Sequence, residues 1–268
     1  MKNWWLFDTD MLIHSLSLDD GVRLAVENTR AQSAPIAVSA FSQVELKGNY
    51  IQDLLLLRRK INDSDSLPNC VARIIATGGR RLARMFAQLA RLMSQADLAP
   101  GNWNALKPKM VVILDGQVPI IWDIVASSLG EFVDDFECDR GAEPPQVVGQ
   151  DWTASIPLCT VHNTTCSIVK FFDMHAKALE KLDEVLESLG PAKTAELEHI
   201  HSVIKTTRLR GRYPWEGRTC RQIGDLLIGL QSKAGRGLIS SNKAEHAALS
   251  EGLGYEFREF PIAKIRGT

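Results

Sequence analysis

Short apolar runs alternate along the chain with longer segments in which apolar residues recur at helical spacing. The short runs predict buried strands: WWLF (4–7), IAVS (36–39), MVVIL (110–114), GLIS (237–240) and YEFREF (255–260). The longer segments predict helices: 11–32, 39–61, 78–93, 171–190, 192–205, 221–235 and 242–253. Strands that alternate with helices favour an α/β fold, with a mainly parallel central sheet between helical layers in a three-layer α/β/α arrangement.

Two polar stretches interrupt this pattern. Residues 63–69 (DSDSLPN) predict a loop, and residues 134–152 are polar and rich in Pro and Gly, which predicts a long loop or an excursion at the sheet edge.

Composition and charge are those of an ordinary globular protein and exclude few classes of function. The 268 residues are 45% apolar and 24% charged, with a formal net charge of −1, so there is no overall attraction to nucleic acid or anionic membrane. The five cysteines are scattered and form no C-x-x-C pair, which favours free thiols in a reducing compartment. No apolar run is long enough to span a bilayer, and Asp8 and Asp10 interrupt the first one. We therefore expect a cytoplasmic protein without a membrane partner.

Acidic residues follow or precede the predicted strands at four places. Asp8 ends the first strand, Glu45 lies early in the helix after the second, and Asp225 and Glu245 lie on either side of GLIS. The carboxyl ends of parallel strands meet at one edge of a sheet, where ligands bind. Two carboxylates about 4 Å apart repel by roughly 4 kcal/mol at an effective dielectric near 20, so a cluster requires compensation. Oxygen ligands suit Mg²⁺ or Mn²⁺, which activate water for phosphoryl displacement.

The same residues resemble the motifs of the PIN-domain nucleases. FDTDMLI resembles their opening D-T-N-x-L-I, and VSAFSQVELKG resembles the small-residue stretch that leads to their glutamate. IGDLLIGLQSKAGRGLISSNKAEH resembles their third and fourth motifs, an aspartate opening a helix and then a strand ending in T-R-N-x-x-D.

The resemblance implies the fold, the metal and the site residues. Asp8, Glu45 and Asp225 would be the main metal ligands for Mg²⁺ or Mn²⁺, and Glu245 the fourth acid. Three residues would support them: Asp10, Ser240 and Asn242. The implied activity is a metal-dependent ribonuclease with RNA as its substrate, in a toxin–antitoxin or defence system. An antitoxin or other protein, or a second copy in a homodimer, would then be a partner.

The chain departs from the family pattern at several points. Asp10 replaces an asparagine, Glu245 an aspartate and His246 an aromatic residue. The 179 residues between Glu45 and Asp225 imply a largely helical insertion, about residues 55–205, within one PIN-like domain over 1–268. MVVIL within it is the best candidate for a core strand of the sheet.

Each acid also has a plain structural interpretation. Asp8 could cap a helix, Glu45 could be solvated, and Asp225 could pair with Arg221 or Lys233. Asp115, after MVVIL, is either a fifth acid at a strand end or part of an Asp-Gly turn. His199 and His201 would point to different helix faces, which argues against a zinc site.

A basic stretch, KTTRLRGRYPWEGRTCR (205–221), precedes Asp225. Arginines for phosphates and aromatic rings for bases suit single-stranded RNA, and the alternative is a solvated loop. The predicted RNA-binding residues are Lys205, Arg208, Arg210, Arg212, Trp215, Arg218 and Arg221. Arg80, Arg81, Arg84 and Arg91 form a second cationic face, for which a solvated helix surface is the favoured interpretation.

Two other functions stay open. A PIN-like scaffold with a decayed site would bind RNA or protein without catalysis, as the altered fourth motif favours. A haloacid-dehalogenase-type phosphatase also opens with D-x-D after a strand, but Leu12 stands where that family has threonine or valine.

Overall fold

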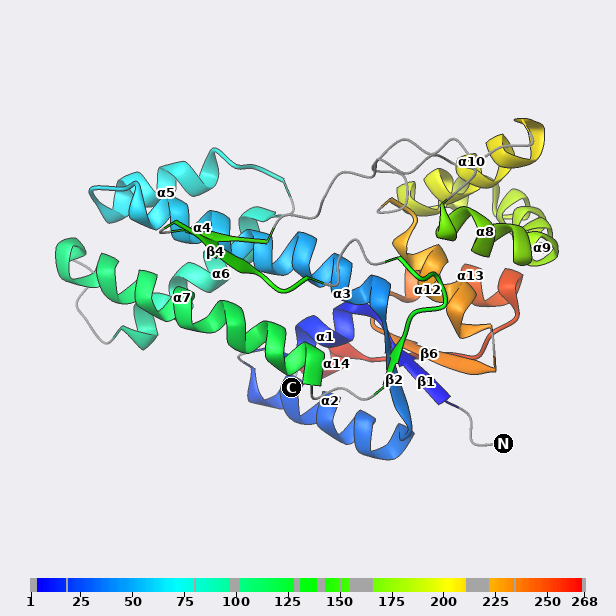
Figure 1. Cartoon of the computed structure of the whole chain (residues 1–268), viewed down its shortest axis with the longest axis horizontal. Coiled ribbons are helices and arrows are strands. Elements are labelled where there is room, and N and C mark those ends of the chain that lie inside the picture. Colours follow the sequence, from blue (N-terminus) through cyan, green and yellow to red (C-terminus); the bar gives the residue numbers. More distant parts are fainter. Residues whose placement is uncertain are drawn as a thin grey trace. The chain divides into compact units, whose positions relative to one another are not determined.

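The structure, a computed structural model of the chain, contains a five-stranded parallel sheet (Figure 1). The structure describes residues 4–17, 19–79, 81–96, 102–127, 131–138, 143–149, 151–154, 166–210, 222–233 and 235–266. The strands are β1 (Trp4–Phe7), β2 (Ile36–Ser39), β3 (Glu131–Val133), β6 (Arg236–Ser240) and β7 (Phe257–Glu259), in the order β3-β2-β1-β6-β7.

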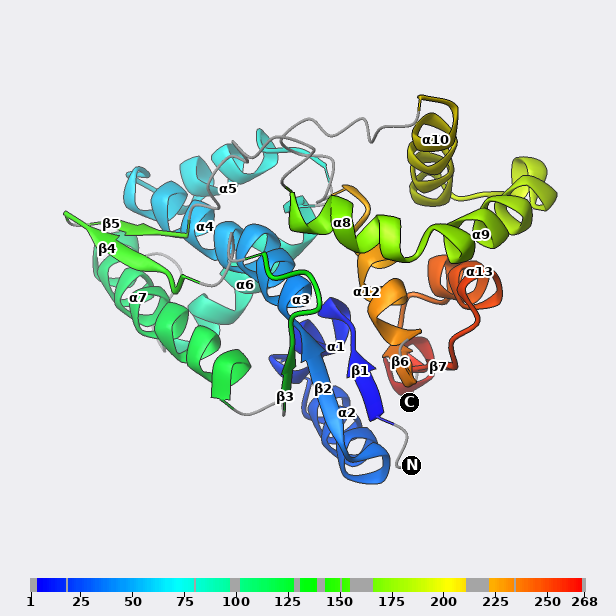
Figure 2. The same cartoon turned by 45° about the vertical axis from the view of Figure 1, so that its right-hand side comes forward.

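Strand β1 lies in the middle of this sheet. Trp5 is in register with Ile36 of β2 on one side and with Gly237 of β6 on the other. From β1 the chain builds the sheet first toward β2 and β3 and later toward β6 and β7, as Figure 2 shows. The direction of sheet growth therefore reverses between β1 and β6. In open parallel sheets ligands bind outside the carboxyl ends of the strands at such a reversal.

Contacts divide the chain into two compact units. Unit 1 comprises residues 1–46, 127–143 and 157–268, and unit 2 comprises residues 47–126 and 144–156.

Unit 1 contains the parallel sheet and most of the helices. The helices are α1 (Thr9–Ser15), α2 (Asp20–Ser33), α3 (Ala40–Leu46), α8 (Ser167–Met174), α9 (Ala176–Ser188), η3 (Gly190–Ala192), α10 (Ala195–Arg210), α12 (Gly224–Ser232), α13 (Lys243–Leu253) and α14 (Ile262–Arg266). Their apolar faces join the strands in one core that includes Leu6, Leu182, Leu227 and Leu238. The α/β class and the parallel sheet are confirmed, and the helices are compatible with a three-layer arrangement.

Unit 2 is helical apart from one hairpin. Its elements are η1 (Lys47–Ile51), α4 (Gln52–Asn62), α5 (Leu67–Ile75), α6 (Arg81–Gln95), α7 (Trp103–Ser127, whose last residue is counted in unit 1), and the antiparallel strands β4 (Gln146–Val148) and β5 (Asp151–Thr153). No helix in the described ranges is long and apolar enough to cross a membrane.

The prediction of a strand at MVVIL is wrong, because residues 110–114 lie inside α7. Leu106, Met110, Leu114 and Val118 are fully buried at a spacing of four, which is the stripe of a helix packed on one side. Asp115 consequently lies on this helix and not at a strand end, and both its carboxylate oxygens accept hydrogen bonds from Arg58. The fifth strand of the sheet is β3, which the sequence pattern did not predict.

The other differences are local. The predicted helix over 11–32 is two helices, α1 and α2, and the helix over 171–190 is divided at His175 into α8 and α9. The predicted loop 63–69 already contains the start of α5, because the Ser66 hydroxyl accepts a hydrogen bond from the Asn69 N–H, at 3.3 Å, and caps that helix. The excursion over 134–152 includes β4 and the start of β5.

Candidate functional site

Asp8 stands at the junction of β1 and α1. It caps α1, since Oδ1 accepts a hydrogen bond from the Thr9 N–H at 2.6 Å. Its other oxygen faces β6 and α13: Oδ2 accepts hydrogen bonds from the Ser240 hydroxyl at 2.8 Å and from His246 Nε2 at 3.1 Å. The side chain is therefore both a helix cap and a member of a polar cluster at the carboxyl edge of the sheet.

Asp225 reaches the same place from the first turn of α12. Its Oδ2 accepts a hydrogen bond from Asn242 Nδ2 at 2.9 Å, and its Oδ1 lies 4.0 Å from His246 Nε2. One ligand atom each from Asp8, Asp225 and His246 lie within 4.8 Å of one another. Burial is the main cause that raises the pKa of Asp225 to about 7, with the charge of Asp8 acting in the same direction and that of His246 opposing it.

Glu45 enters from α3, which follows β2. Its Oε2 accepts a hydrogen bond from the Thr9 hydroxyl at 2.5 Å. Its Oε1 lies directly over the first residue of α12, because a Cβ added to Gly224 would be only 2.0 Å from it. Burial and then the charges of Asp225 and Asp8 raise the pKa of Glu45 well above its ordinary value, which places the carboxyl group in the field of both aspartates.

Asp10, the second residue of α1, is bound to the end of β6 and the residue after it. Its Oδ2 accepts hydrogen bonds from the N–H of Ser241 at 2.6 Å, from the Ser241 hydroxyl, and from the Ser240 hydroxyl at 3.2 Å. Its Oδ1 is buried and has no hydrogen-bond partner in the described part of the chain. Burial and the charge of Asp8 raise the pKa of Asp10 to about 6.

His246 is the site residue that the sequence analysis did not propose. It is fully buried on α13, and its Nδ1 lies 3.1 Å from the Tyr255 hydroxyl while Nε2 faces Asp8. Burial lowers the pKa of His246, but the hydrogen bond and charge of Asp8, followed by the charge of Asp225, outweigh burial and raise it to about 9. His246 is therefore an imidazolium at neutral pH. Burial by itself would raise the pKa of Asp8, but the hydrogen bond and charge of His246 outweigh burial and hold that pKa below its ordinary value.

Glu245, the predicted fourth ligand, precedes His246 on α13 and is half-buried. It is close enough for its charge to raise the pKa of Asp225, but it is not one of the three residues whose ligand atoms converge. Glu196 of α10, which the sequence did not single out, acts on the pKa of both Glu45 and Asp225 in the same direction. Two glutamates, Glu245 and Glu196, therefore add negative charge at the edge of the site, and His246 is the third residue whose ligand atom converges with those of Asp8 and Asp225.

The donors at this site fit a divalent metal ion. Asp8 and Asp225 offer converging oxygen ligands, as Mg²⁺ and Mn²⁺ prefer. Glu45, a predicted main ligand, is not one of the three residues whose ligand atoms converge; its carboxylate and the unpartnered Oδ1 of Asp10 are further oxygens nearby. Imidazole is a ligand for transition metals and not for Mg²⁺, so participation of His246 would favour Mn²⁺ over Mg²⁺. Metal binding at His246 would also require loss of its proton.

The predicted RNA-binding stretch is described only in part. Lys205 contacts Glu187, and the backbone of Arg208 and Arg210 belongs to the end of α10. The remaining predicted residues lie outside the described residues: Arg212, Trp215, Arg218 and Arg221.

Two other predictions concern groups away from the sheet edge. His201 Nε2 lies 3.2 Å from both Asp183 and Glu187, as part of the α9–α10 packing. In α6, Arg81 and Arg84 are not simply solvated: both contact the buried Asp53 of α4, at 3.2 and 2.7 Å.

Comparison with known proteins adds no relative, because no family model, no curated protein and no solved structure matches the chain.

Proposed function

We propose that this protein is a metal-dependent endoribonuclease of the PIN type. One observation carries the proposal: Asp8, Glu45 and Asp225 come from three different elements and gather at the carboxyl edge where sheet growth reverses. Ligand oxygens of Asp8 and Asp225 lie within 4.8 Å of each other, and both charges raise the pKa of Glu45, so the three carboxylates repel one another unless a cation compensates them. A divalent ion is the compensation that also serves hydrolysis of a phosphodiester.

The side chains have separable roles in this proposal. Asp8 and Asp225 would hold the ion, with Glu45 beside them, and Glu245 and Glu196 would contribute negative charge at the periphery. When bound, the ion supplies activation of water and stabilisation of the leaving oxygen.

The neighbouring polar side chains position these carboxylates. Asn242 holds Oδ2 of Asp225, and Thr9 holds Oε2 of Glu45. Ser240 bridges Asp8 and Asp10 through one hydroxyl. Such contacts fix each carboxylate in one rotamer and so reduce the cost of orienting it for the metal.

The experiment is cleavage of a mixed pool of single-stranded and structured RNA. Wild type is compared with Asp8→Asn/Asp225→Asn in Mn²⁺, in Mg²⁺ and in EDTA. The matched control is Asp20→Asn/Asp63→Asn, which removes two exposed carboxylates. We expect cleavage by wild type and control with metal, at least hundredfold less with the site variant, and none in EDTA. Equal cleavage by the two variants would contradict the proposal.

The alternative of a non-catalytic RNA- or protein-binding scaffold is favoured by one observation, the position of His246. Its imidazolium already gives Asp8 and Asp225 the positive charge that a metal ion would give. Thermal unfolding with added Mn²⁺ separates the two functions. Stabilisation of wild type but not of Asp8→Asn/Asp225→Asn supports the metal site, whereas no stabilisation of either protein, together with no cleavage, supports the scaffold.

A further inference from the structure

Helix α7 of unit 2 carries apolar residues on two opposite sides. The stripe from Leu106 to Val118 is buried, and Figure 2 shows α4 and α6 on the same side of α7. The other side carries Val112 and Ile120, whose side chains are 69% and 58% exposed. A helix that is apolar on both sides is typical of one that is covered on both sides. The exposed side of α7 therefore has the character of a surface that packs against a partner.

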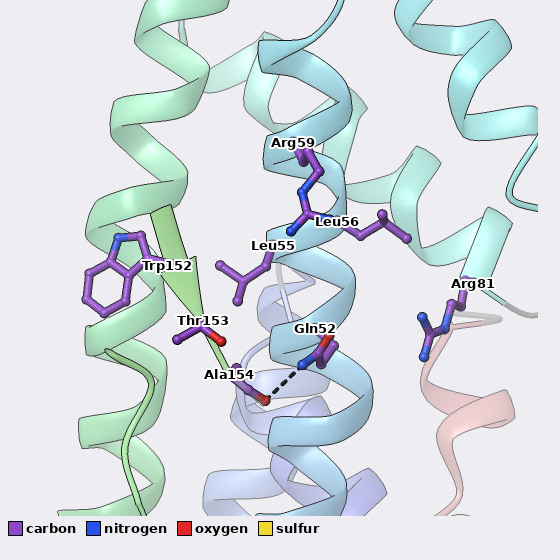
Figure 3. A pocket seen from close by; sticks show the side chains of 8 residues that line it. All are labelled: Gln52, Leu55, Leu56, Arg59, Arg81, Trp152, Thr153 and Ala154. Atoms are coloured by element: carbon purple, nitrogen blue, oxygen red, sulfur yellow. Dashed lines mark hydrogen bonds between the residues drawn. The ribbon is translucent and has the colours of Figure 1, made fainter. Parts of the chain in front are cut away.

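The α4 side of unit 2 offers no comparable surface among the described residues. There Gln52 Nε2 donates a hydrogen bond of 2.8 Å to the carbonyl of Ala154, which holds the chain after β5 against α4 (Figure 3). The pocket that remains beside this contact has a volume of about 130 Å³. It has room for one small group and not for a helix of another chain.

Gly116 lies at the centre of the exposed side of α7. Asp115, the residue before it, accepts hydrogen bonds from Arg58 of α4. Gln117, the residue after it, donates a hydrogen bond of 3.4 Å from Nε2 to Gln95 of α6. Between these two inward contacts, a Cβ added to Gly116 would meet no described atom within 4 Å beyond its own chain neighbours. Because the glycine has no side chain, a second helix can approach the backbone of α7 closely at this point.

The residues on either side of Gly116 form a self-complementary pattern. Val112 and Ile120 each lie four positions from Gly116, and Lys109 and Asp123, both exposed, each lie seven positions from it. At 3.6 residues per turn, all four fall on the same side of the helix as Gly116. In an antiparallel pair of α7 helices with a two-fold axis at Gly116, each residue faces the one at the same separation in the opposite direction. Val112 then meets Ile120 of the second copy, and Lys109 meets Asp123 of the second copy.

We propose that the exposed side of α7 joins two copies of this chain in an antiparallel homodimer. The apolar residues form the centre of the contact, and an ion pair lies at each end. The order of the charges decides the direction, because a parallel pair would place Lys109 opposite Lys109 of the second copy. The formal net charge of −1 causes no overall repulsion between copies. The inference goes beyond the proposed nuclease activity and does not depend on it, since every contact lies within α7.

A single pair of helices is a small interface. It buries less than the roughly 1,200 Å² at which stable complexes begin, so we expect a dissociation constant on the order of 10 µM. The ion pairs at its ends are exposed and are therefore screened by salt. Added sodium chloride should weaken the dimer without abolishing it, because the apolar centre does not depend on charge.

The test is sedimentation velocity of the full chain without RNA, at concentrations on both sides of this dissociation constant. The first variant is Ile120→Glu. Its matched control is Ile75→Glu in α5, since Ile75 belongs to the same unit and is 56% exposed. The charge variants are Lys109→Glu, Asp123→Lys and the combination of both changes.

We expect Ile120→Glu to weaken the dimer at least about a hundredfold, because it places two carboxylates in the apolar centre, and Ile75→Glu to leave it unchanged. Each single charge change should weaken the dimer about tenfold, since attraction at both ends becomes repulsion. The combination Lys109→Glu/Asp123→Lys exchanges the two charges and should restore most of the affinity.

Three results would overturn the proposal. The first is a wild type that stays monomeric at every concentration. The second is equal dimerisation of Ile120→Glu and Ile75→Glu. The third is a combined charge variant no better than the single ones, which would exclude antiparallel pairing about Gly116. Thermal unfolding verifies that each variant is folded. A monomeric wild type whose melting temperature falls much more with Ile120→Glu than with Ile75→Glu would show instead that part of the same chain covers this side of α7.

Discussion

His246 Nε2 lies 3.1 Å from Oδ2 of Asp8, and both side chains are almost completely buried. The pair is the closest contact between a positive and a negative group at the candidate site, and it joins α13 to the end of β1. A buried ion pair contributes little net stability compared with apolar residues, but loss of one partner leaves the other charge uncompensated.

Replacement of His246 should therefore be costly when no metal is present. We expect His246→Ala to lower the free energy of unfolding by roughly 3–5 kcal/mol, because the charge of Asp8 remains buried. Urea unfolding in EDTA measures the effect, with His199→Ala of α10 as the control, for which about 1 kcal/mol or less is expected. An effect of His246→Ala no larger than that of the control would contradict the ion pair.

The pH dependence of stability follows from the same groups. The pKa of Asp225 is raised from 3.8 to about 7, so the folded protein holds its proton more tightly, and stability falls as the pH rises through this range. The pKa of His246 is raised from 6.5 to about 9, so its contribution is complete below 6.5 and is lost as the pH rises toward 9. The contribution of Asp8, whose pKa is lowered, is lost only as the pH falls below its ordinary value of 3.8.

Thermal unfolding in EDTA should accordingly show a melting temperature that declines from about pH 5 to about pH 9. Asp225→Asn should flatten the decline below pH 7, whereas Glu251→Gln, an exposed change on α13, should leave it unaltered. A melting temperature that rises over this interval would show that the acids are not held as the structure places them.

Gly224 provides a test of the position of Glu45. A Cβ at residue 224 would lie 2.0 Å from Oε1 of Glu45 and 2.9 Å from the ring of Phe41, so Gly224→Ala must displace the carboxylate. The carboxylate is the end of a flexible side chain, and the protein should stay folded. We expect RNA cleavage to fall by about a hundredfold, as displacements of about 1 Å at catalytic groups do.

The matched control is Gly116→Ala in α7, where nothing lies within 4 Å of the added carbon. It should leave cleavage unchanged and stabilise the protein by roughly 0.5–1 kcal/mol. Equal cleavage by the two variants would show that the position of Glu45 does not matter for the reaction.

Asp53 organises the packing of α4 against α6 in unit 2. It is 4% exposed, and its two oxygens contact Arg81 and Arg84. We expect Asp53→Ala to destabilise the protein by about 1–3 kcal/mol, since two guanidinium groups lose their acceptor. The control is Asp20→Ala, which removes the exposed partner of Arg23 and should cost about 1 kcal/mol or less. Hydrogen exchange in α4 and α6 should locate the loss in unit 2.

The central strands could be predicted because short apolar runs are bounded by polar residues. IAVS coincides with β2, and WWLF with β1. MVVIL has the same pattern but lies in α7, because a short apolar run in a buried helix cannot be distinguished from a strand by periodicity alone. β3 was missed for the opposite reason: two of its three residues are exposed, and it gives no apolar run.

The candidate site was predictable for residues that lie at a strand end or in the first turn of a helix next to a strand. Asp8 and Asp225 converge, and Asn242 and Ser240 contact them. His246 was not predicted because the last acid of the T-R-N-x-x-D motif of the PIN-domain nucleases aligns with Glu245. The helical spacing of the buried residues His246, Leu249 and Leu253 already indicates that position 246 faces inward. Glu196 carries no such signal, since its proximity depends on the packing of distant helices.

The placement of β1 between β2 and β6 has a consequence for biosynthesis. Ser240 donates to Asp8 across 232 positions of sequence, so one side of the central strand has no partner until residues 236–240 have left the ribosome. Pairing over so long a separation is slow, because the chain must lose much of its freedom before the contact forms. During translation Asp8 and Glu45 can therefore come together early, whereas Asp225 and His246 join them only after β6 has paired with β1.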